Sequence, residues 1–362
     1  MFKSLASKLA IATAISASAA LSKLSSDAFL RVKTRSPATK PAQAAPQGKH
    51  RVGVVINPSK NRYEEAKATI EDACREKGWP APKFWETTIE DPGTKQTQAA
   101  LKADCDLILV CGGDGTVRKC SEELLETDIP MGIVPIGSGN LFSRNLRLLT
   151  LNLRKSVDTA LFGKERYVDV GHVQLDGGER EIWLVMTGLG ADGYAISITK
   201  PKLKKYLSWV AYLESGARSI MDGRRDKVSV TIDDQEPFEA NIRSIMGANC
   251  SILPGQVDLI PEAVIDDGVM NIMILSPRTP WGWLNIGTRI LLQAKRPEGI
   301  FTMVEAKSLT VESENPIQAQ IDGDFAGEVQ KMELTIAPSS LKVKVPQKRA
   351  KLPLDMILNT ST

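Results

Sequence analysis

Histidine is scarce in this 362-residue chain, which has only His50 and His172. Two histidines exclude a His-rich metal site, and a Ser–His–Asp triad would have to depend on His172. The five cysteines lack CxxC spacing. Because their number is odd and several lie in apolar runs, they indicate reduced, buried thiols in a reducing compartment. The net charge is only +3, so the chain as a whole is not a binder of polyanions.

The N-terminus lacks a long hydrophobic run. The uncharged span from Leu9 to Ser22 is too short and too rich in serine to predict a transmembrane helix. With the lysines before it and Ala17-Ser18-Ala19 as a cleavage-like end, it resembles a signal peptide; a membrane tether and a dispensable extension are the alternatives. We assign residues 1–30 to this signal-like or tether segment. Residues 31–50, which are basic and contain three prolines, are assigned to a disordered linker.

From Arg51 onward, short apolar runs alternate with amphipathic segments. The runs predict strands at 51–58, 82–88, 106–111 and 131–137. Helices are predicted at 63–78, at 94–103, after the glycines of the turn at 112–115, and at 140–148. Strands that alternate with helices indicate a parallel sheet, and ligands bind such sheets at the carboxyl ends of the strands. Residues 51–165 are therefore predicted to form a three-layer α/β nucleotide-binding domain.

Two glycine-rich turns follow neighbouring predicted strands, "VCGGDGT" and "PIGSGN". Neither is a GxxxxGK[ST] loop, which excludes that class of phosphate site. Glycines let the backbone approach a ligand closely, and the helix that follows offers N–H groups to a phosphate. Alternatively, the first turn is only a tight connection in which Asp114 and Thr116 are local caps. Two such turns side by side indicate a nucleoside triphosphate.

The second half of the chain reads as short strands with polar turns. Two alternating segments flank Asp176-Gly177 and predict a hairpin. Further short strands are predicted as far as "MELTIAP", which ends at Pro338. Residues 166–346 are therefore predicted to form a β-rich domain, and 347–362 a tail.

The segments "INPSKN", "ETTIEDPG", "VCGGDGTVRKC" and "VPIGSGNLFSRNL", followed later by "IDGD", resemble the diacylglycerol kinase catalytic domain family. Its superfamily also contains sphingosine and ceramide kinases and bacterial lipid kinases. The resemblance covers Arg51 to Pro346. GGDGT alone is shared with NAD kinases, whereas the combination is specific. The resemblance implies an α/β nucleotide domain, then an all-β sandwich-like domain that binds lipid, with the last strands returning to the first domain.

The resemblance also implies functions for individual residues. Nucleotide contacts are implied for Asn57, for Thr87 or Thr88, and for the two turns, which comprise Gly112, Gly113, Asp114, Gly115, Thr116, Gly137, Ser138, Gly139 and Asn140. Metal contacts are implied for Asp114 and Asp169. Leu141 stands where bacterial members carry a further aspartate, which puts a three-aspartate metal cluster in doubt.

Phosphoryl transfer needs Mg²⁺ and a base for the hydroxyl proton. The resemblance implies Asp322 of "IDGD" as the base, with Asp324 in place of the usual glutamate, and Asp114 as the rival base. The alternative for "IDGD" is a hairpin turn with solvated carboxylates. Asp266 and Asp267 resemble an element beside a structural metal in some members, or form a polar turn.

Basic and aromatic residues in two segments suit an anionic membrane surface. They are Lys200, Lys202, Lys204, Lys205, Trp209 and Tyr212 in the first segment, and Trp281 and Trp283 in the second. A solvated charge run before a packed helix is the alternative for the first, and core packing for the second. Asp192 matches the position at which sphingosine kinases recognise the sphingoid base.

Together these features predict an ATP- and Mg²⁺-dependent lipid kinase that phosphorylates a primary hydroxyl, with diacylglycerol as the first choice of acceptor. A sphingoid-base or ceramide kinase, an NAD kinase, and a non-catalytic lipid or nucleotide sensor are the alternatives; Leu141 and Asp324 would favour the sensor. The expected partners are a lipid substrate and a membrane surface, not nucleic acid, and a homodimer is left open. The expected location is cytoplasmic, peripheral to or tethered at the membrane.

Overall fold

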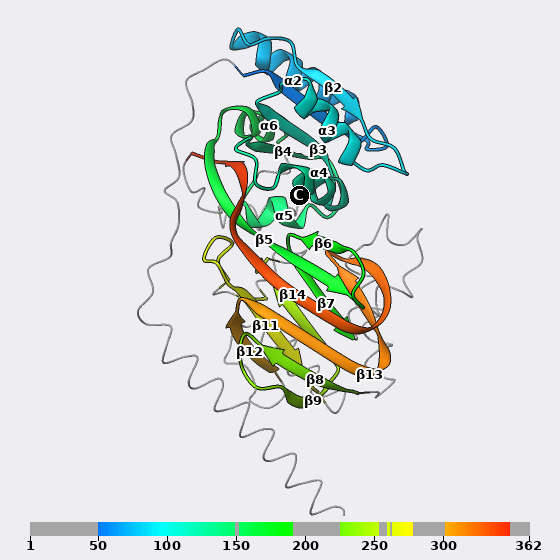
Figure 1. Ribbon diagram of the computed structural model, residues 1–362. Helices are drawn as coiled ribbons and strands as arrows, with labels where there is room; N and C mark the ends of the chain where they lie inside the picture. Colours follow the sequence, from blue (N-terminus) through cyan, green and yellow to red (C-terminus); the bar gives the residue numbers. More distant parts are fainter. Residues whose placement is uncertain are drawn as a thin grey trace, which may run out of the picture. The chain divides into compact units, whose positions relative to one another are not determined.

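The computed structural model describes residues 50–148, 152–190, 225–252, 259–260, 263–277 and 301–347 (Figure 1). These residues belong to two compact units. One unit runs to Tyr167 and resumes at Leu341, and the other extends from Val168 to Ser340. Strands β5 (Lys164–Leu175) and β14 (Asp324–Val345) each pass from one unit to the other.

The first unit, here called the α/β unit, is built on a parallel sheet. Its strands, in the order β4-β3-β1-β2, are β4 (Met131–Pro135), β3 (Leu107–Gly112), β1 (Val52–Ile56) and β2 (Lys83–Glu86). Every residue of β1, β3 and β4 is buried, which explains why each is a continuous apolar run. The end of β14 joins β4 in parallel, with Val343 opposite Met131.

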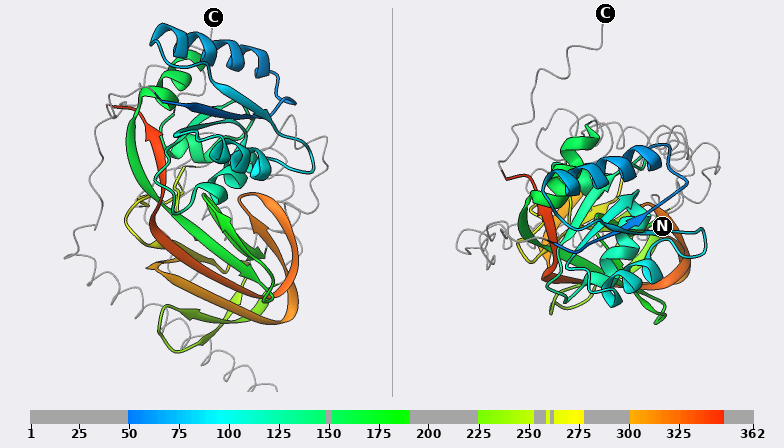
Figure 2. Two further views of the ribbon diagram at one scale, coloured as in Figure 1. Left: turned by 45° about the horizontal axis from the view of Figure 1, so that its top comes forward. Right: turned by 90° about the horizontal axis from the view of Figure 1, so that it is seen from above.

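Helices cover both faces of this sheet (Figure 2). Helices α2 (Tyr63–Glu76) and α6 (Leu153–Phe162) share a hydrophobic core with β1 and β3. Helices α3 (Thr94–Lys102) and α4 (Asp114–Leu124) pack against each other and contact β1 and β3, respectively. A short helix, α5 (Leu141–Asn145), follows β4. The predicted α/β fold class is therefore confirmed.

The second unit, here called the β-rich unit, is antiparallel. Its strand order is β12-β11-β10-β7-β13-β14; β8 pairs with β13 and β9 with β8, while β5 pairs with β14 and β6 with β5. The strands not yet defined are β6 (Arg180–Trp183), β7 (Met186–Gly190), β8 (Asp226–Ile232), β9 (Phe238–Ile242), β10 (Ser244–Ala248), β11 (Met270–Leu275), β12 (Phe301–Ala306) and β13 (Ser308–Ile321). Trp183, fully buried, lies in its hydrophobic core.

The predicted hairpin at Asp176-Gly177 is confirmed: it joins β5 to β6, and both residues have positive φ, 47° and 70°. Positive φ at both central residues is the condition for a type I′ turn. Asp322-Gly323 joins β13 to β14 in the same way, with φ of 49° and 84°. Asn, Asp and Gly tolerate these dihedrals best, so the residues of both turns suit their backbone.

Candidate nucleotide site

The two glycine-rich turns lie at the carboxyl ends of adjacent strands, as the sequence predicted. β3 and β4 pair in register to their last residues, Gly112 opposite Pro135. Beyond them, the N–H groups of Ile136 and Gly137 both donate to the carbonyl oxygen of Gly112, at 3.2 and 3.1 Å. This contact holds the start of the second turn against the first.

The glycines of these turns have two different reasons to lack a side chain. A Cβ at Gly137 would lie 2.5 Å from the Cα of Gly113, so the close approach of the two turns requires glycine there. A Cβ at Gly113 would meet only the Cα of Gly137, at an ordinary 3.6 Å, and one at Gly115 would meet nothing within 4 Å. The fold itself therefore does not require glycine at 113 or 115, whereas close approach of a ligand would.

Helix α4 begins at the first of these glycine turns. Its N-cap is Gly113, which has no side chain to cap it. The first-turn N–H groups of a helix lack partners within the helix and carry its positive dipole end. An 11-residue helix that starts at a glycine turn is the kind of helix terminus that can bind a phosphate group.

Asp114 lies in the first turn of α4, but its carboxylate is used by α5. Its Oδ1 accepts the N–H of Phe142 at 3.3 Å. Burial raises the pKa of Asp114, and N–H groups of Phe142, Leu141 and Asn140 partly offset that rise. The carboxylate also interacts with the N–H of Asp114 itself, in the first turn of α4, so the side chain joins the start of this helix to the second turn.

The second turn is held by its own side chains. Asn140, at φ 51° and ψ 44°, is in the left-handed region and donates from Nδ2 to the carbonyl oxygen of Gly137 at 2.7 Å. Arg144 donates from Nε to the carbonyl oxygen of Gly139 at 2.9 Å. Ser138 is exposed at the tip of the turn. The turn is therefore fixed before any ligand binds.

The residues after β1 and β2 lie at the same sheet edge. Asn57 accepts at Oδ1 from the backbone N–H and the hydroxyl of Ser59, at 3.0 and 2.7 Å. The Thr88 hydroxyl accepts the N–H of Asp91 at 3.1 Å and closes a local turn. The Thr87 hydroxyl is buried and has no hydrogen-bond partner among the described residues, so of the two threonines it is Thr87 that retains a hydrogen bond for a ligand.

The two predicted metal ligands, Asp114 and Asp169, belong to different units. Asp169 is fully buried and accepts the N–H groups of Ser339 at 2.7 Å and Gly268 at 2.6 Å, one at each carboxylate oxygen. Within the described ranges, no group of three or more His, Cys, Asp or Glu is placed to hold a metal ion.

Asp267 lies in the turn before β11 and accepts the N–H of Val269 at 3.2 Å. Burial, together with the nearby carboxylates of Asp169 and Glu305, raises the pKa of Asp267 to about 6. Its neighbour Asp266 is half-buried in the same turn. Asp266 and Asp267 thus lie in a turn of partly buried carboxylates. Among the described residues, they belong to no group of three or more His, Cys, Asp or Glu that could hold a metal ion.

Asp322 lies in the hairpin turn between β13 and β14, and its carboxylate is bonded rather than solvated. It accepts the N–H groups of Leu184 at 2.9 Å, Val185 at 2.8 Å and Met186 at 3.1 Å. Asp324, two residues on, is exposed. The alternative prediction of a hairpin turn at "IDGD" is correct. Its prediction that the Asp322 carboxylate is solvated is wrong.

Two other aspartates with positive φ behave like Asp322. Asp176 accepts the N–H groups of Gln330 and Lys331, at 2.9 and 2.7 Å. Asp233 accepts those of Lys307 and Ser308, at 2.8 and 2.9 Å. Neither lies in a segment that carries the family resemblance, so a turn aspartate that accepts backbone N–H groups is a recurrent feature of the β-rich unit, not one specific to Asp322.

Several predictions fall outside the described residues: Asp192, the basic and aromatic positions between Lys200 and Tyr212, Trp281 and Trp283, the segment 1–49, and the tail after 347. No helix in the part of the chain that the structure describes is long and apolar enough to span a membrane.

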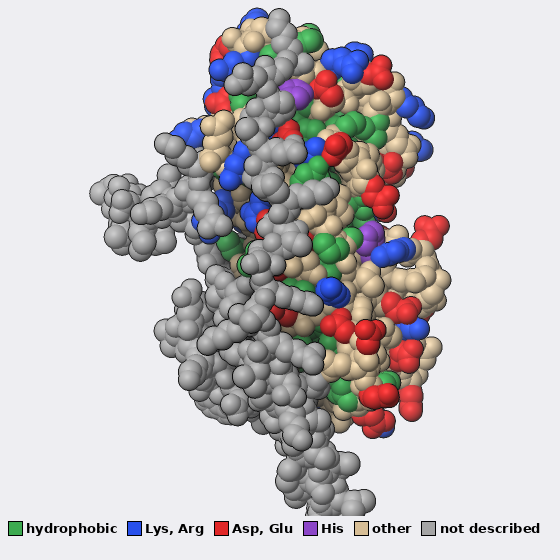
Figure 3. Space-filling view, turned by 60° about the vertical axis from the view of Figure 1, so that its left-hand side comes forward, with side chains coloured by type: hydrophobic (Ala, Val, Ile, Leu, Met, Phe, Trp, Pro, Cys, Tyr) green, Lys and Arg blue, Asp and Glu red, His purple; other side chains and the backbone are tan. Residues whose placement is uncertain are grey.

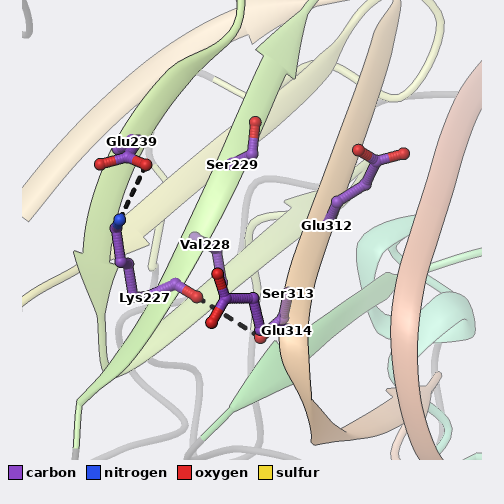
Figure 4. Close-up of a pocket in the computed structure, with 7 residues that line it drawn as sticks. All are labelled: Lys227, Val228, Ser229, Glu239, Glu312, Ser313 and Glu314. Carbon is purple, nitrogen blue, oxygen red and sulfur yellow. Dashed lines mark hydrogen bonds and ion pairs between the residues drawn. The ribbon is translucent and has the colours of Figure 1, made fainter.

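The surface of the β-rich unit carries a separate groove. Acidic side chains gather over this unit on the face drawn in Figure 3. The groove, of about 290 Å³, lies on β8, β9 and β13 (Figure 4) and is lined by Lys227, Val228, Ser229, Glu239, Glu312, Ser313 and Glu314. The Lys227 ammonium pairs with the Glu239 carboxylate at 2.8 Å. None of the predicted site residues lines this groove.

Two family models match consecutive parts of the chain. Residues 51–173 match the diacylglycerol kinase catalytic domain, and residues 185–345 match the YegS C-terminal NAD kinase beta sandwich-like domain. The chain therefore carries a diacylglycerol kinase catalytic domain, followed by a YegS-like C-terminal domain. The resemblance read from the motifs is thereby confirmed, and with it the prediction of an enzyme of the lipid kinase class.

Curated relatives cover most of the chain at low identity. A diacylglycerol kinase of Bacillus subtilis is 24% identical over 281 residues, 76% of this chain and 90% of that protein. One from Mycobacterium tuberculosis is 27% identical over 255 residues, 69% of this chain and 80% of that protein. A solved structure of a diacylglycerol kinase from Bacillus anthracis matches with a TM-score of 0.60 and 21% sequence identity. The match covers 83% of this chain and 98% of that one, so the two share a fold.

Proposed function

We propose that this diacylglycerol kinase family member transfers the terminal phosphoryl group of ATP to a primary hydroxyl of a lipid, with diacylglycerol as acceptor and phosphatidic acid as product. The observation that carries the proposal is the start of α4 at Gly113, where glycines that the fold does not require leave room for phosphates. The choice of diacylglycerol as acceptor rests on the curated relatives, which are named diacylglycerol kinase.

The residues of the α/β unit would bind the nucleotide. The first-turn N–H groups of α4 and the turn from Gly137 to Asn140 bind the phosphates, and Asn57 and Thr87 lie nearer the base and ribose. Mg²⁺, when bound, neutralises the phosphate charge. It prefers substrate phosphates and water with one or two carboxylates, so the nucleotide can bring it without a preformed protein cage.

The base in this proposal is Asp322. The acceptor hydroxyl loses its proton to the Asp322 carboxylate as its oxygen bonds to the terminal phosphorus, and ADP leaves. Three backbone donors fix the carboxylate in one orientation and favour its ionised form, which is the form that can accept a proton.

The proposal includes association with a membrane, because the acceptor is a lipid. The segment 1–49 and the basic, aromatic stretch from Lys200 to Tyr212 would supply the contact. A sphingoid base or ceramide is the second candidate acceptor, and Leu141 in place of an acidic residue is the observation that favours it.

The decisive experiment incubates the purified full chain with labelled ATP, Mg²⁺ and a total lipid extract, and identifies the labelled product by mass spectrometry. Labelled phosphatidic acid supports the proposal. A labelled sphingoid or ceramide phosphate moves it to the second candidate, and NADP formed from added NAD would replace it with an NAD kinase. ATP binding without any product would favour the non-catalytic sensor.

A further inference from the structure

The end of β2 holds two buried polar atoms that the fold leaves without partners. The Oγ1 of Thr87 has no hydrogen-bond partner among the described residues, and its side chain is buried, with 4% of the residue exposed. The Oε1 of Gln96, in α3, is likewise buried and unpaired within the described part of the chain. Unsatisfied buried polar atoms are costly, and in native proteins they commonly mark a place for a ligand or water.

These two atoms lie on either side of one peptide group. Gln96 donates from Nε2 to the carbonyl oxygen of Glu86 at 3.1 Å, and Thr87 is the next residue. Phe84 packs into the core with α2, so by strand alternation Thr87 points to the opposite sheet face, the one that carries α3. Both atoms therefore belong to the same face of the same strand end.

The chemistry of the pair is fixed. Because the Glu86 carbonyl can only accept, the amide nitrogen of Gln96 must face it, and Oε1 is left as a pure acceptor. The Thr87 hydroxyl can donate. The pair thus presents one acceptor and one donor on the same face of the strand end.

The position suits the base of a nucleotide whose phosphates occupy the glycine turns. The strand order is β4-β3-β1-β2, and neighbouring strands lie about 4.8 Å apart. The end of β2 is therefore roughly 10 Å from the end of β3 and roughly 14 Å from that of β4 along the same sheet edge. An extended nucleoside triphosphate spans this range between its base and its phosphates.

We propose that Gln96 and Thr87 read the edge of the purine and select adenine over guanine or hypoxanthine. This inference rests on the proposed function. The adenine amino group donates to Gln96 Oε1 and the ring N1 accepts from Thr87 Oγ1. Guanine and hypoxanthine carry an oxygen in place of that amino group, which would face the Gln96 acceptor and leave it unpaired. Gln96 is thus a specificity-determining residue that no motif marked.

The test measures affinities of the full chain for ATP, inosine triphosphate, purine riboside triphosphate and inorganic tripolyphosphate by calorimetry. Purine riboside lacks the amino group, so wild type should bind it roughly threefold to tenfold more weakly than ATP, the effect of one net hydrogen bond, and inosine triphosphate more weakly still. In Gln96→Leu the three nucleotides should bind alike, while tripolyphosphate binding stays unchanged.

A second variant covers the case in which Gln96→Leu loosens the turn. Thr87→Val is nearly isosteric and removes a hydroxyl that nothing in the described chain uses, so the melting temperature should hold or rise while ATP affinity falls roughly threefold to tenfold. Thr88→Val is the matched control; it removes the acceptor of the Asp91 N–H and should lower the melting temperature without changing the ratio between nucleotides.

The outcomes separate the two proposals. Equal binding of all three nucleotides to wild type, or discrimination that survives in Gln96→Leu, overturns the base-reading pair and leaves the phosphate site standing. An unchanged ATP affinity in Thr87→Val also overturns it. Failure of wild type to bind both ATP and tripolyphosphate would overturn the proposed function, and this inference with it.

Discussion

The carboxylate of Asp114, in the first turn of α4, accepts the backbone N–H of Phe142, in α5, at 3.3 Å. It therefore joins the two glycine turns that follow β3 and β4. Leu141 removes the neighbouring acidic group that bacterial relatives are expected to carry, and N–H groups of α5 partly offset the cost of burying the Asp114 charge. In this chain the aspartate therefore holds the two turns of the proposed phosphate site together.

The first prediction concerns this link. Asp114→Asn leaves a single side-chain acceptor among several N–H donors, so we expect a loss of about 1–3 kcal/mol in the free energy of unfolding and weaker ATP binding with lower turnover. Gly139→Ala should act alike, because its Cβ would lie 2.8 Å from Asp114 Oδ2 and displace it. Thermal melts and ATP titrations check both. Normal ATP affinity with lost turnover in Asp114→Asn would instead make Asp114 the base.

The second prediction tests the phosphate turn. Gly113→Ala introduces a Cβ that meets only Gly137 at 3.6 Å, so the melting temperature should hardly change. ATP affinity should fall at least tenfold, because the Cβ blocks a polar contact to the phosphates. A tenfold loss corresponds to about 1.4 kcal/mol of binding free energy. Gly178→Ala, in the β5–β6 hairpin, is the control and should leave ATP affinity intact. If Gly113→Ala and Gly178→Ala both bind ATP with wild-type affinity in a calorimetric titration, the turn at Gly113 does not bind the phosphates.

The third prediction follows from Asp267. Its pKa of about 6 exceeds the roughly 3.9 of an unfolded aspartate, so between about pH 4 and 6 the folded protein keeps a proton that the unfolded chain releases. Stability contributed by this group therefore falls as pH rises through that window and stays lower above it. Asp267→Asn can still accept the Val269 N–H and should be more stable than wild type at pH 7 by about 1–3 kcal/mol, with little difference at pH 4.

Urea unfolding of both proteins from pH 4 to 7 measures this effect. Asp266→Asn, one residue away in the same turn, makes the matched change of charge. If that variant alters the pH profile as much as Asp267→Asn, the effect belongs to the charge of the turn in general and the assignment to Asp267 is wrong.

The sequence predicted the α/β unit because its signals are local. Parallel strands covered on both faces are unbroken apolar runs, as at Val52–Ile56, and the glycine turns are contiguous in sequence. The hairpin at Asp176-Gly177 was equally local. What could not be predicted were the partners: the N–H groups that Asp322 accepts lie 136 to 138 residues away in sequence. The same applies to Asp114, whose interaction with α5 depends on the side-by-side pairing of β3 and β4.

Gln96 was missed for a related reason. A glutamine in a helix is ordinary, and only the burial of its Oε1 and the commitment of its Nε2 to Glu86 distinguish it. Thr87 and Thr88 were equivalent in sequence, and they separate only because Thr88 closes a turn with Asp91. Site residues that act through unpaired atoms leave no pattern in the chain.

The last prediction tests Asp322 as the base against its structural role. Asp322→Asn removes the proton acceptor, and loss of a general base typically costs on the order of 10²–10⁴-fold in rate. It also turns an amide donor toward the N–H groups of Leu184 to Met186, so some loss of activity could come from the turn itself.

Asp176→Asn makes the same change in a turn of the same geometry, whose carboxylate accepts two backbone N–H groups and which no motif marks. The two variants should therefore lose similar stability, on the order of 1–3 kcal/mol, whereas only Asp322→Asn should lose kcat by orders of magnitude. ATP affinity should change little in either, because both residues belong to the β-rich unit and the glycine turns belong to the α/β unit. Thermal melts, kcat and ATP titrations of the pair decide the matter. Equal losses of kcat in the two variants would leave Asp322 a structural aspartate, and the search for the base would pass to Asp114.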